Sequence, residues 1–191
     1  MGQNDKAVSN HEQALAIRRE IKDRDGEGST LVSLGLDYVD LSQYEKAIGY
    51  VEQSLAIKRE LKNRPGEADA LGSLATAYQY MSRFEKAVDY NGQALAIYRE
   101  TQNRKGEASV LNSTGNAYLA LNQIDKAIGY YQQSLAIKRE LKDRMGEANS
   151  LTNIGIAYSY LGSDLPGADP MRRTRYEKAI VYLEAGAGGS A

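Results

Sequence analysis

Apolar residues recur along this chain at helical spacing, and the whole pattern returns every 40 residues. Between residues 27 and 41 the apolar positions step by three, four and three, which is the spacing of one face of a helix. These positions are Leu31, Leu34, Tyr38 and Leu41. A second helical face follows, formed by Ala47, Ile48, Val51, Leu55 and Ile57. Each repeat is therefore predicted to be a pair of helices joined by short turns.

The turn inside each pair carries a helix-start signal. Ser42 with Glu45, and Ser82 with Glu85, have the spacing of a capping box, in which the Ser hydroxyl caps the second helix and the Glu reaches back. Residues 122–125 are a weaker version of the same pattern. Each cap is expected to contribute about 1 kcal/mol, so the break between the two helices is encoded in every repeat.

The turn between successive pairs contains a glycine followed by Glu. These glycines are Gly26, Gly66, Gly106 and Gly146. We expect each to be the left-handed residue that ends a helix, with the following Glu near the positive N-terminus of the next helix. Glu60 and Arg64, like their equivalents in the other repeats, are expected to form an i,i+4 ion pair.

These signals predict a repeat array over residues 1–161. In it, a lone helix over 3–23 precedes helix pairs that begin at 27, 67 and 107, and a further first helix covers 147–161. The period then slips by 12 residues, because Tyr176 stands where residue 164 is expected. Three segments complete the chain: an inserted loop over 162–175, a short final helix over 176–185 that Thr174 caps, and a flexible tail over 186–191.

The recurring residues of each pair resemble those of the tetratricopeptide repeat (TPR). The first helix has an apolar residue and then a small one, with an aromatic residue three positions later, and the second helix has an alanine. These residues are Leu34-Gly35, Leu74-Ala75, Thr114-Gly115 and Ile154-Gly155, then Tyr38, Tyr78, Tyr118 and Tyr158, and then Ala47, Ala87, Ala127 and Ala179. The 40-residue period is most similar to TPRs of kinesin light chains, spindle-orientation scaffolds and many bacterial multidomain proteins. The resemblance implies an all-α fold, a right-handed solenoid of antiparallel helix pairs.

In TPR arrays the first helices line a concave groove, and the resemblance therefore places a ligand groove on this chain. The predicted groove residues are Val32, Leu36, Val39, Asp69, Thr76, Gln79, Asn112, Asn116, Asn149, Thr152, Asn153 and Ile156. They differ between repeats, whereas the second-helix segments barely differ. Divergence towards a ligand and drift of unconstrained surface residues are both open explanations.

The chemistry of the predicted groove indicates a class of ligand. The set contains no Lys or Arg, which disfavours the capture of a C-terminal carboxylate that some TPRs perform. The asparagines can both donate to and accept from a peptide backbone, and Val32, Leu36 and Val39 make one end apolar. The implied ligand is an elongated peptide with an apolar end and a polar middle.

Composition excludes several other classes of function. A net charge of −1 gives no basic excess for nucleic acid, and no apolar run is long enough to cross a membrane. The absence of cysteine suits a reducing, cytoplasmic compartment. His11 is the single histidine, so the sequence offers too few histidines for a metal cluster and disfavours a His-based triad. We therefore expect neither an enzyme nor a bound cofactor or metal.

The sequence thus predicts a protein–protein interaction scaffold, and two alternatives stay open. One is self-association through the terminal repeats, because helix 3–23 has no first helix before it and the final helix is short. The partner would then be a second copy of the chain. The other is a regulatory segment of a larger signalling protein.

Overall fold

The computed structural model describes residues 3–163 and 170–187, and these residues form two compact units, Met1–Gln102 and Asn103–Ala191. The regular structure in the described residues is entirely α-helical. The first unit contains α1 (Gln3–Glu20), α2 (Arg24–Asp40), α3 (Tyr44–Glu60), α4 (Arg64–Tyr80) and α5 (Phe84–Glu100). The second contains α6 (Arg104–Ala120), α7 (Ile124–Glu140), α8 (Arg144–Ser163) and α9 (Pro170–Ala187).

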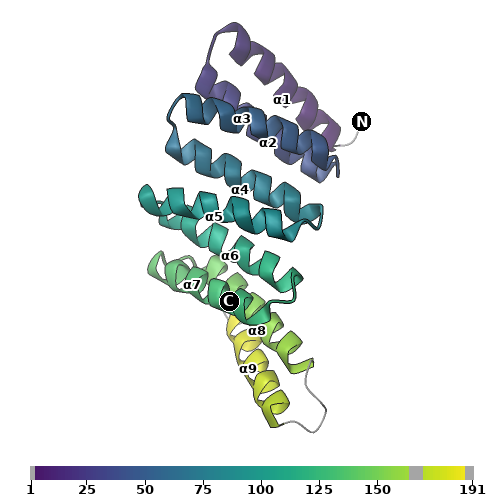
Figure 1. Ribbon diagram of the computed structural model, residues 1–191, viewed down its shortest axis with the longest axis vertical. Coiled ribbons are helices and arrows are strands. Elements are labelled where there is room, and N and C mark those ends of the chain that lie inside the picture. The colour runs from purple at the N-terminus through teal and green to yellow at the C-terminus, as the bar shows by residue number, and fades with distance from the viewer. Residues whose placement is uncertain (1–2, 164–169, 188–191) are drawn as a thin grey trace. The chain divides into compact units, whose positions relative to one another are not determined.

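Within each unit, helices that follow one another along the chain pack side by side in opposite directions (Figure 1). The tightest pairs are α2 with α3, α4 with α5, α6 with α7, and α8 with α9. Each pair is one repeat, so we call α2, α4, α6 and α8 inner helices, and we call α1, α3, α5, α7 and α9 outer helices. The predicted all-α repeat fold is confirmed.

The small residue of the inner helix allows this close packing. A Cβ added at Gly35 would lie 2.3 Å from Val51 Cγ2, and one at Gly115 would lie 2.5 Å from Tyr131 Cε1. In the last pair Leu183 approaches Gly155 in the same way. Because real Cβ atoms do not approach this closely, glycine is required wherever the facing side chain is large.

A tyrosine pair with a lysine above it recurs in each helix pair. Tyr38 stacks on Tyr50 with ring centroids 5.3 Å apart, and the Lys46 ammonium lies 5.3 Å from the Tyr38 centroid. The other pairs repeat this group with Tyr78, Tyr90 and Lys86, with Tyr118, Tyr130 and Lys126, and with Tyr158, Tyr182 and Lys178. Such stacks contribute about 0.5–1.5 kcal/mol beyond the area that they bury, so the inner tyrosine fixes the position of the outer helix as well as filling the core.

The turns inside the pairs differ from the predicted capping boxes. Ser42 has a φ of 57°, and Gln43, which precedes α3, makes no side-chain cap. The N–H of Gln43 donates to the Tyr38 carbonyl and that of Ser42 to the Val39 carbonyl, which is the Schellman end of α2. Ser42 is therefore the left-handed residue that closes the preceding helix, and the prediction of a Ser cap was wrong.

The turns between the pairs also differ from the prediction, which made the glycine of each turn the left-handed residue. The left-handed residue is Lys62 (φ 53°) rather than Gly66, and no described glycine has a positive φ. Asn63 caps α4, because its side-chain oxygen accepts from the Gly66 N–H at 2.9 Å. Gly66 lies in the first turn of α4, where a Cβ would meet the Lys58 stem at 2.7 Å. Close approach, and not a left-handed backbone, explains this glycine.

The charges at these turns form a ladder between helices. The Arg64 guanidinium donates to Glu67 at 2.6 Å and to Glu100 at 2.5 Å, and Arg59 also donates to Glu67. Glu60 bonds Arg24, one repeat earlier, and not Arg64. The expected i,i+4 pair is therefore wrong, because Arg64 begins α4 and bonds Glu100 at the end of α5, the outer helix of its own pair.

The C-terminal region is more helical than the sequence predicted. Helix α8 continues to Ser163 and α9 begins at Pro170, whose missing N–H and fixed φ suit the first turn of a helix. Thr174 therefore lies inside α9 and does not cap it. Arg173 pairs with Glu177, and Arg175 donates to the Leu161 carbonyl, so part of the predicted loop is helix docked on α8. The proposed tail begins inside α9, and residues 188–191 lie outside the described part.

Candidate functional site

The predicted groove residues of the first unit lie on α2 and α4. Leu36 is 42% exposed, and Val32 is half-buried beside it. Val39 is buried in the core that Leu31, Leu34 and Tyr38 form, so it is not available to a ligand. The prediction for Val39 was wrong because the face of α2 that packs on α1 and α3 is wider than the apolar spacing suggested.

A pocket of about 340 Å³ opens between the N-terminal turns of α2 and α4. Its lining is Asp25, Ser29, Val32, Lys58, Asn63, Pro65, Gly66 and Asp69. The buried Lys58 ammonium donates to the Asp25 carbonyl, to Asp25 Oδ1 and to Ser29 Oγ at 2.9–3.0 Å. All three of its N–H groups are used within the protein, so Lys58 has little capacity left to bind an anion.

The two carboxylates of this pocket are exposed. Lys58, and then Asn63, hold the pKa of Asp25 below its ordinary value, so Asp25 carries a negative charge at neutral pH. Asp69 Oδ1 accepts from the Tyr98 hydroxyl at 2.7 Å. The two acids face one committed ammonium, and the pocket is therefore net negative.

The remaining predicted residues of α4 contribute less. The Thr76 hydroxyl donates to the Gly72 carbonyl of its own helix at 3.1 Å, and Gln79 is half-buried. Both lie on the same helix as Asp69, further along it than the pocket. The structure therefore leaves Leu36 and the acidic pocket as the most distinctive surface of these two helices.

In the second unit the predicted asparagine cluster is partly engaged. Asn153 donates to the Asn112 side-chain oxygen at 3.0 Å, and this bond links α8 to α6. Asn116 accepts from the Tyr131 hydroxyl at 2.8 Å. The sequence placed these residues on one surface, but their mutual bonds could not be read from it because the partners are 41 and 15 residues apart.

Helix α8 adds an apolar surface. Ile156 is 39% exposed and borders, with Ser159, Tyr160 and Tyr176, a shallow cleft of about 330 Å³. Asn149 is exposed, whereas the Thr152 hydroxyl donates to the Ala148 carbonyl. Ile156 and Leu36 stand at equivalent positions of their repeats, so each unit presents a partly exposed aliphatic side chain at this position of an inner helix.

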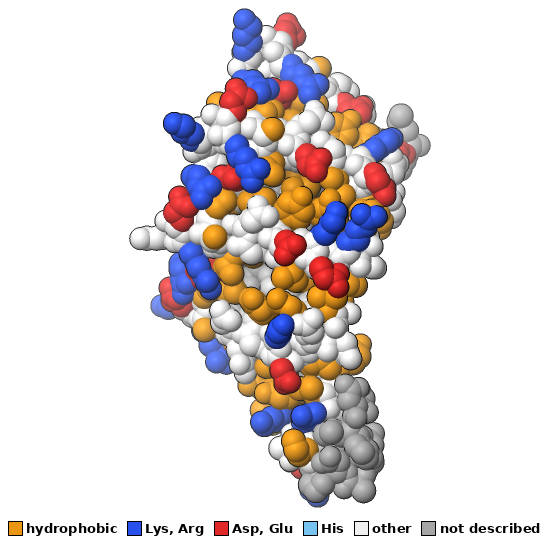
Figure 2. All heavy atoms as spheres, in the orientation of Figure 1, with side chains coloured by type: hydrophobic (Ala, Val, Ile, Leu, Met, Phe, Trp, Pro, Cys, Tyr) orange, Lys and Arg blue, Asp and Glu red, His pale blue; other side chains and the backbone are white. Residues whose placement is uncertain are grey.

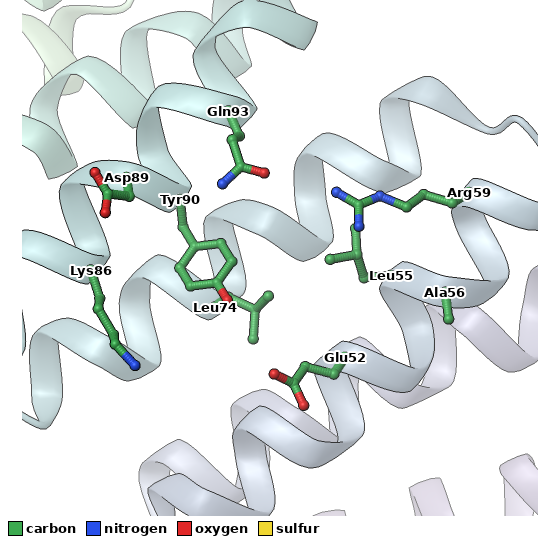
Figure 3. Close-up of a pocket in the computed structure, with 9 residues that line it drawn as sticks. All are labelled: Glu52, Leu55, Ala56, Arg59, Leu74, Lys86, Asp89, Tyr90 and Gln93. Carbon is green, nitrogen blue, oxygen red and sulfur yellow. The ribbon is translucent and has the colours of Figure 1, made fainter.

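A further cleft, of about 570 Å³, lies between the outer helices α3 and α5 (Figure 3). Leu55, Leu74 and Tyr90 form its apolar floor, and Glu52, Arg59, Lys86 and Asp89 surround it. Arg59 is paired with Glu67, and Lys86 lies over the Tyr78 ring. One sequence signal marks this cleft, since Asp89 replaces the glycine found at positions 49 and 129.

His11 makes a contact that sequence reasoning missed. Its Nδ1 lies 2.5 Å from the Asp37 carboxylate, which is 15% exposed. Asp37 stands where the other inner helices have the buried alanines Ala77, Ala117 and Ala157. A polar pair thus replaces an apolar contact between α1 and α2. The sequence signal for this pair was the Asp at a position where the other three inner helices have alanine.

The described residues offer little for metal chemistry or for the membrane. Among them, no group of three or more His, Cys, Asp or Glu residues is arranged to hold a metal ion. No helix in the described part is both long and apolar enough to span a bilayer. On the face shown in Figure 2, Lys and Arg side chains are interspersed with Asp and Glu around hydrophobic patches, so positive charge is not gathered on that face as a nucleic-acid interface requires.

Comparison with known families gives a consistent result. The family model for the tetratricopeptide repeat matches four overlapping segments, 1–60, 40–100, 66–140 and 106–164. Together these matches include most of the chain. No curated protein matches the sequence.

Several solved structures share the fold at low sequence identity. A putative kinesin light chain from Podosopora anserina with nearly identical TPR-like repeats is 21% identical, with a TM-score of 0.72, covering 100% of this chain and 88% of that one. BtubC (BKLC) from P. vanneervenii is 15% identical, with a TM-score of 0.73 and coverages of 100% and 89%. A Rap protein complexed with Competence and Sporulation Factor is 16% identical, with a TM-score of 0.73 and coverages of 94% and 49%.

Proposed function

This chain belongs to the tetratricopeptide repeat family, and on that basis we propose that it is a non-catalytic scaffold that binds a peptide or helix of a partner protein along its inner helices. TPR proteins in general mediate protein–protein interactions. The Rap protein that shares this fold was solved in complex with Competence and Sporulation Factor, which supports a role in binding a partner. We further propose that it acts in the cytoplasm, because it has no cysteine.

The observation that carries the proposal is the partly exposed aliphatic side chain on an inner helix of each unit. Leu36 and Ile156 offer apolar anchors. Since full burial of such a side chain contributes about 1.5–3 kcal/mol, covering the part that is still exposed contributes about 1 kcal/mol. Next to Leu36, the pocket with Asp25 and Asp69 is net negative. We propose that a Lys or Arg of the ligand enters this pocket while an adjacent apolar residue covers Val32 and Leu36.

The second unit, taken by itself, offers a peptide Asn149, Ile156 and the apolar cleft beside Tyr160. The amide groups of Asn112 and Asn153 bond each other, but each amide has further donor and acceptor capacity. A ligand backbone could use that capacity without breaking the bond between them. This part of the surface would therefore tolerate a range of extended peptides, whereas the acidic pocket would supply the selectivity.

A peptide-display selection on the purified protein tests the proposal. We expect enrichment of peptides with one Lys or Arg next to apolar residues. Leu36→Glu should weaken the selected peptides about tenfold or more, equal to about 1.4 kcal/mol, and Asp69→Asn should weaken basic peptides more than neutral ones. Ala96→Glu, on the exposed side of α5, is the matched control.

Either of two outcomes would contradict this assignment. One is that selection enriches no peptide family. The other is that the selected peptides bind Leu36→Glu and Ile156→Glu as tightly as the wild type, with unchanged helical circular dichroism in both variants. Binding lost in Ala96→Glu instead would move the site to the outer helices, where the cleft between α3 and α5 lies.

Self-association is a second candidate function, and a specific observation favours it. Ile17 of α1 is exposed, although its equivalents in α3, α5 and α7 are buried. Ile21, just after the end of α1, is also exposed, and neighbouring exposed apolar side chains of this kind mark a contact site. We propose that a second copy of the chain covers it. The third possibility, a regulatory segment of a larger signalling protein, stays a prediction.

A further inference from the structure

The outer face of α1 shows which kind of surface it accepts. Ile17 is 56% exposed, whereas Ile57, Ile97 and Ile137 are 5%, 4% and 4% exposed. Ile57 is buried against the inner helix of its own pair, where its Cγ2 lies 3.3 Å from a Cβ built at Gly28. Ile17 therefore lacks contact with an inner helix that has a small residue at the position of Gly28.

The first turn of α8 lacks the complementary contact, which is with the end of an outer helix. Arg24, Arg64 and Arg104 each bond two carboxylates, one in their own helix and one, Glu60, Glu100 or Glu140, at the end of the outer helix of the pair. Arg144 bonds only Glu147 among the described residues, and its side chain is 69% exposed against 41–44% for the other three. Met145 beside it is also exposed.

The reason lies in where α9 ends. Gly186 of α9 packs on α8 at the position where Ser54 of α3 packs on α2. A Cβ built at Gly186 would lie 3.1 Å from the Ala148 carbonyl of α8. Helix α3 continues six residues past Ser54 to Glu60, whereas α9 ends at Ala187. The last two turns of an outer helix, with their Leu, Ile and Glu, are therefore absent from α9.

Helix α1 carries these missing groups. Residues 12–20 differ from residues 52–60 of α3 at only two positions, Ala14 for Ser54 and Arg18 for Lys58. Glu20 corresponds to Glu60, and among the described residues it has no ion pair. Among the described residues, α8 thus has an arginine without its second carboxylate, and α1 has the equivalent carboxylate without an arginine.

We propose that α1 of a second copy packs on α8 in the register in which α3 packs on α2, and that α9 competes for the same face. This inference rests on the self-association candidate and specifies its geometry. Ile17 of the second copy would then lie on Ala148, as Ile57 lies at Gly28, and Glu20 would bond Arg144. Helix α9 holds its place through Leu183 and the Tyr158–Tyr182 stack, so it acts as a displaceable cap that limits assembly.

Sedimentation velocity on the full chain, from about 1 μM to about 1 mM, spans the dissociation constants of weak contacts. We expect wild-type protein to associate in this range. Ile17→Glu should remove the association, whereas Ala16→Glu, on the exposed side of α1, should leave it intact. Glu20→Arg and Arg144→Glu should each weaken it at least threefold, and an equimolar mixture of these two variants should restore it.

Disulfide trapping tests the register independently, because the chain has no cysteine of its own. Equal amounts of Ile17→Cys and Ala148→Cys, oxidised together, should give a cross-linked dimer, since the equivalent positions in α2 and α3 are in contact. Ala16→Cys with Ala148→Cys is the matched control and should give none. Tyr182→Ala, which removes the stack that holds α9, should raise the yield of the cross-link.

The outcomes separate the two proposals. Wild-type protein that stays monomeric over the whole range would overturn self-association and this register together. Association that persists in Ile17→Glu and gives no cross-link between positions 17 and 148 would overturn the register alone. Association that Tyr182→Ala leaves unchanged would overturn the role of α9 as a competing cap.

Discussion

At the scale of single residues, the turns of this protein place ordinary L-residues in the left-handed region. Lys22, Ser42, Lys62, Ser82, Gln102, Asn122 and Lys142 all have φ between 53° and 57°. The left-handed conformation costs an L-residue about 1–2 kcal/mol, and the Schellman bonds compensate for it. The hydrogen bonds that close the turn are made by the backbone, so the residue type at this position can vary although its φ must be positive.

Ser82→Gly is therefore expected to stabilise the protein. Glycine adopts φ near 57° without steric cost, and the gain should be about 0.5–1 kcal/mol after the larger entropy of the unfolded chain is subtracted. Chemical denaturation followed by circular dichroism measures this change. Ser73→Gly, in the middle of α4, is the control and should destabilise, and a loss of stability in Ser82→Gly would show that its hydroxyl has a role in the turn.

The buried acids of the inner helices α2, α4 and α6, which are Glu27, Glu67 and Glu107, make the fold sensitive to low pH. Burial works against ionised Glu67, but its bonds to Arg59 and Arg64 outweigh burial and lower its pKa; in Glu27 the bond to Arg19 is the main cause of the same lowering. A lowered folded pKa contributes stability above the unfolded value of about 4.3, and that stability is lost as the pH falls through the folded pKa.

We therefore expect the free energy of unfolding to fall steeply below about pH 4.3. Glu67→Gln should be less stable than wild type at neutral pH, and its stability should depend less on pH in the acid range. Urea titrations at a series of pH values give the free energy of unfolding of the wild type and of the variant, and thus the slope of each against pH. Equal slopes for the variant and the wild type would show that Glu67 does not hold a lowered pKa.

At the scale of helices, the sequence predicted the elements well because each apolar face is long and regular. Leu31, Leu34 and Tyr38 are all buried as their spacing implied. The turns were misjudged because a Ser followed three residues later by Glu fits both a helix start and the end of the helix before it. Only the backbone bonds between Gln43 and Tyr38 distinguish these cases, and they depend on where α2 stops.

The predicted groove was harder, because a helix has several faces and the sequence does not say which one its neighbours cover. Leu36 and Ile156 are partly exposed as expected, but Val39 is in the core. The links of Asn153 to Asn112, and of Tyr131 to Asn116, join different helices. Pairings of this kind require the spacing between helices, which the repeat pattern alone does not supply.

The contact between the inner and outer helices gives a prediction with an internal control. Gly115→Ala places a methyl group about 2.5 Å from the Tyr131 ring, and overpacking of this kind typically costs about 1–3 kcal/mol. The second repeat already has Ala75 at this position, opposite the smaller Asn91. The double variant Gly115→Ala/Tyr131→Asn, which reproduces the Ala75/Asn91 pair, should therefore lose less than the sum of the single changes, as a double-mutant cycle by thermal denaturation will measure.

At the scale of the whole molecule, the 12 extra residues before Tyr176 leave the repeat register intact. Ala179 and Leu183 contact Gly155 as Ala47 and Val51 contact Gly35, and Tyr182 stacks on Tyr158 as Tyr50 stacks on Tyr38. The extra chain therefore extends the start of α9 and does not change how the helix packs on α8. The repeat contacts, and not the length of the connection, decide where α9 lies.

Deletion of residues 163–174 tests this conclusion. It joins Gly162 to Arg175, so that Leu161, Gly162, Arg175 and Tyr176 correspond to Leu41, Ser42, Gln43 and Tyr44 of the first pair. Gly162 would then occupy the left-handed position of the turn, where glycine is the preferred residue. A shorter connection also reduces the entropy of closing the pair, by about 0.6 kcal/mol for each halving of its length. We expect the variant to melt at the same temperature as the wild type or higher. A lower melting temperature would mean that the bond from Arg175 to the Leu161 carbonyl, and the added first turn of α9, hold the last pair together more strongly than the repeat contacts do.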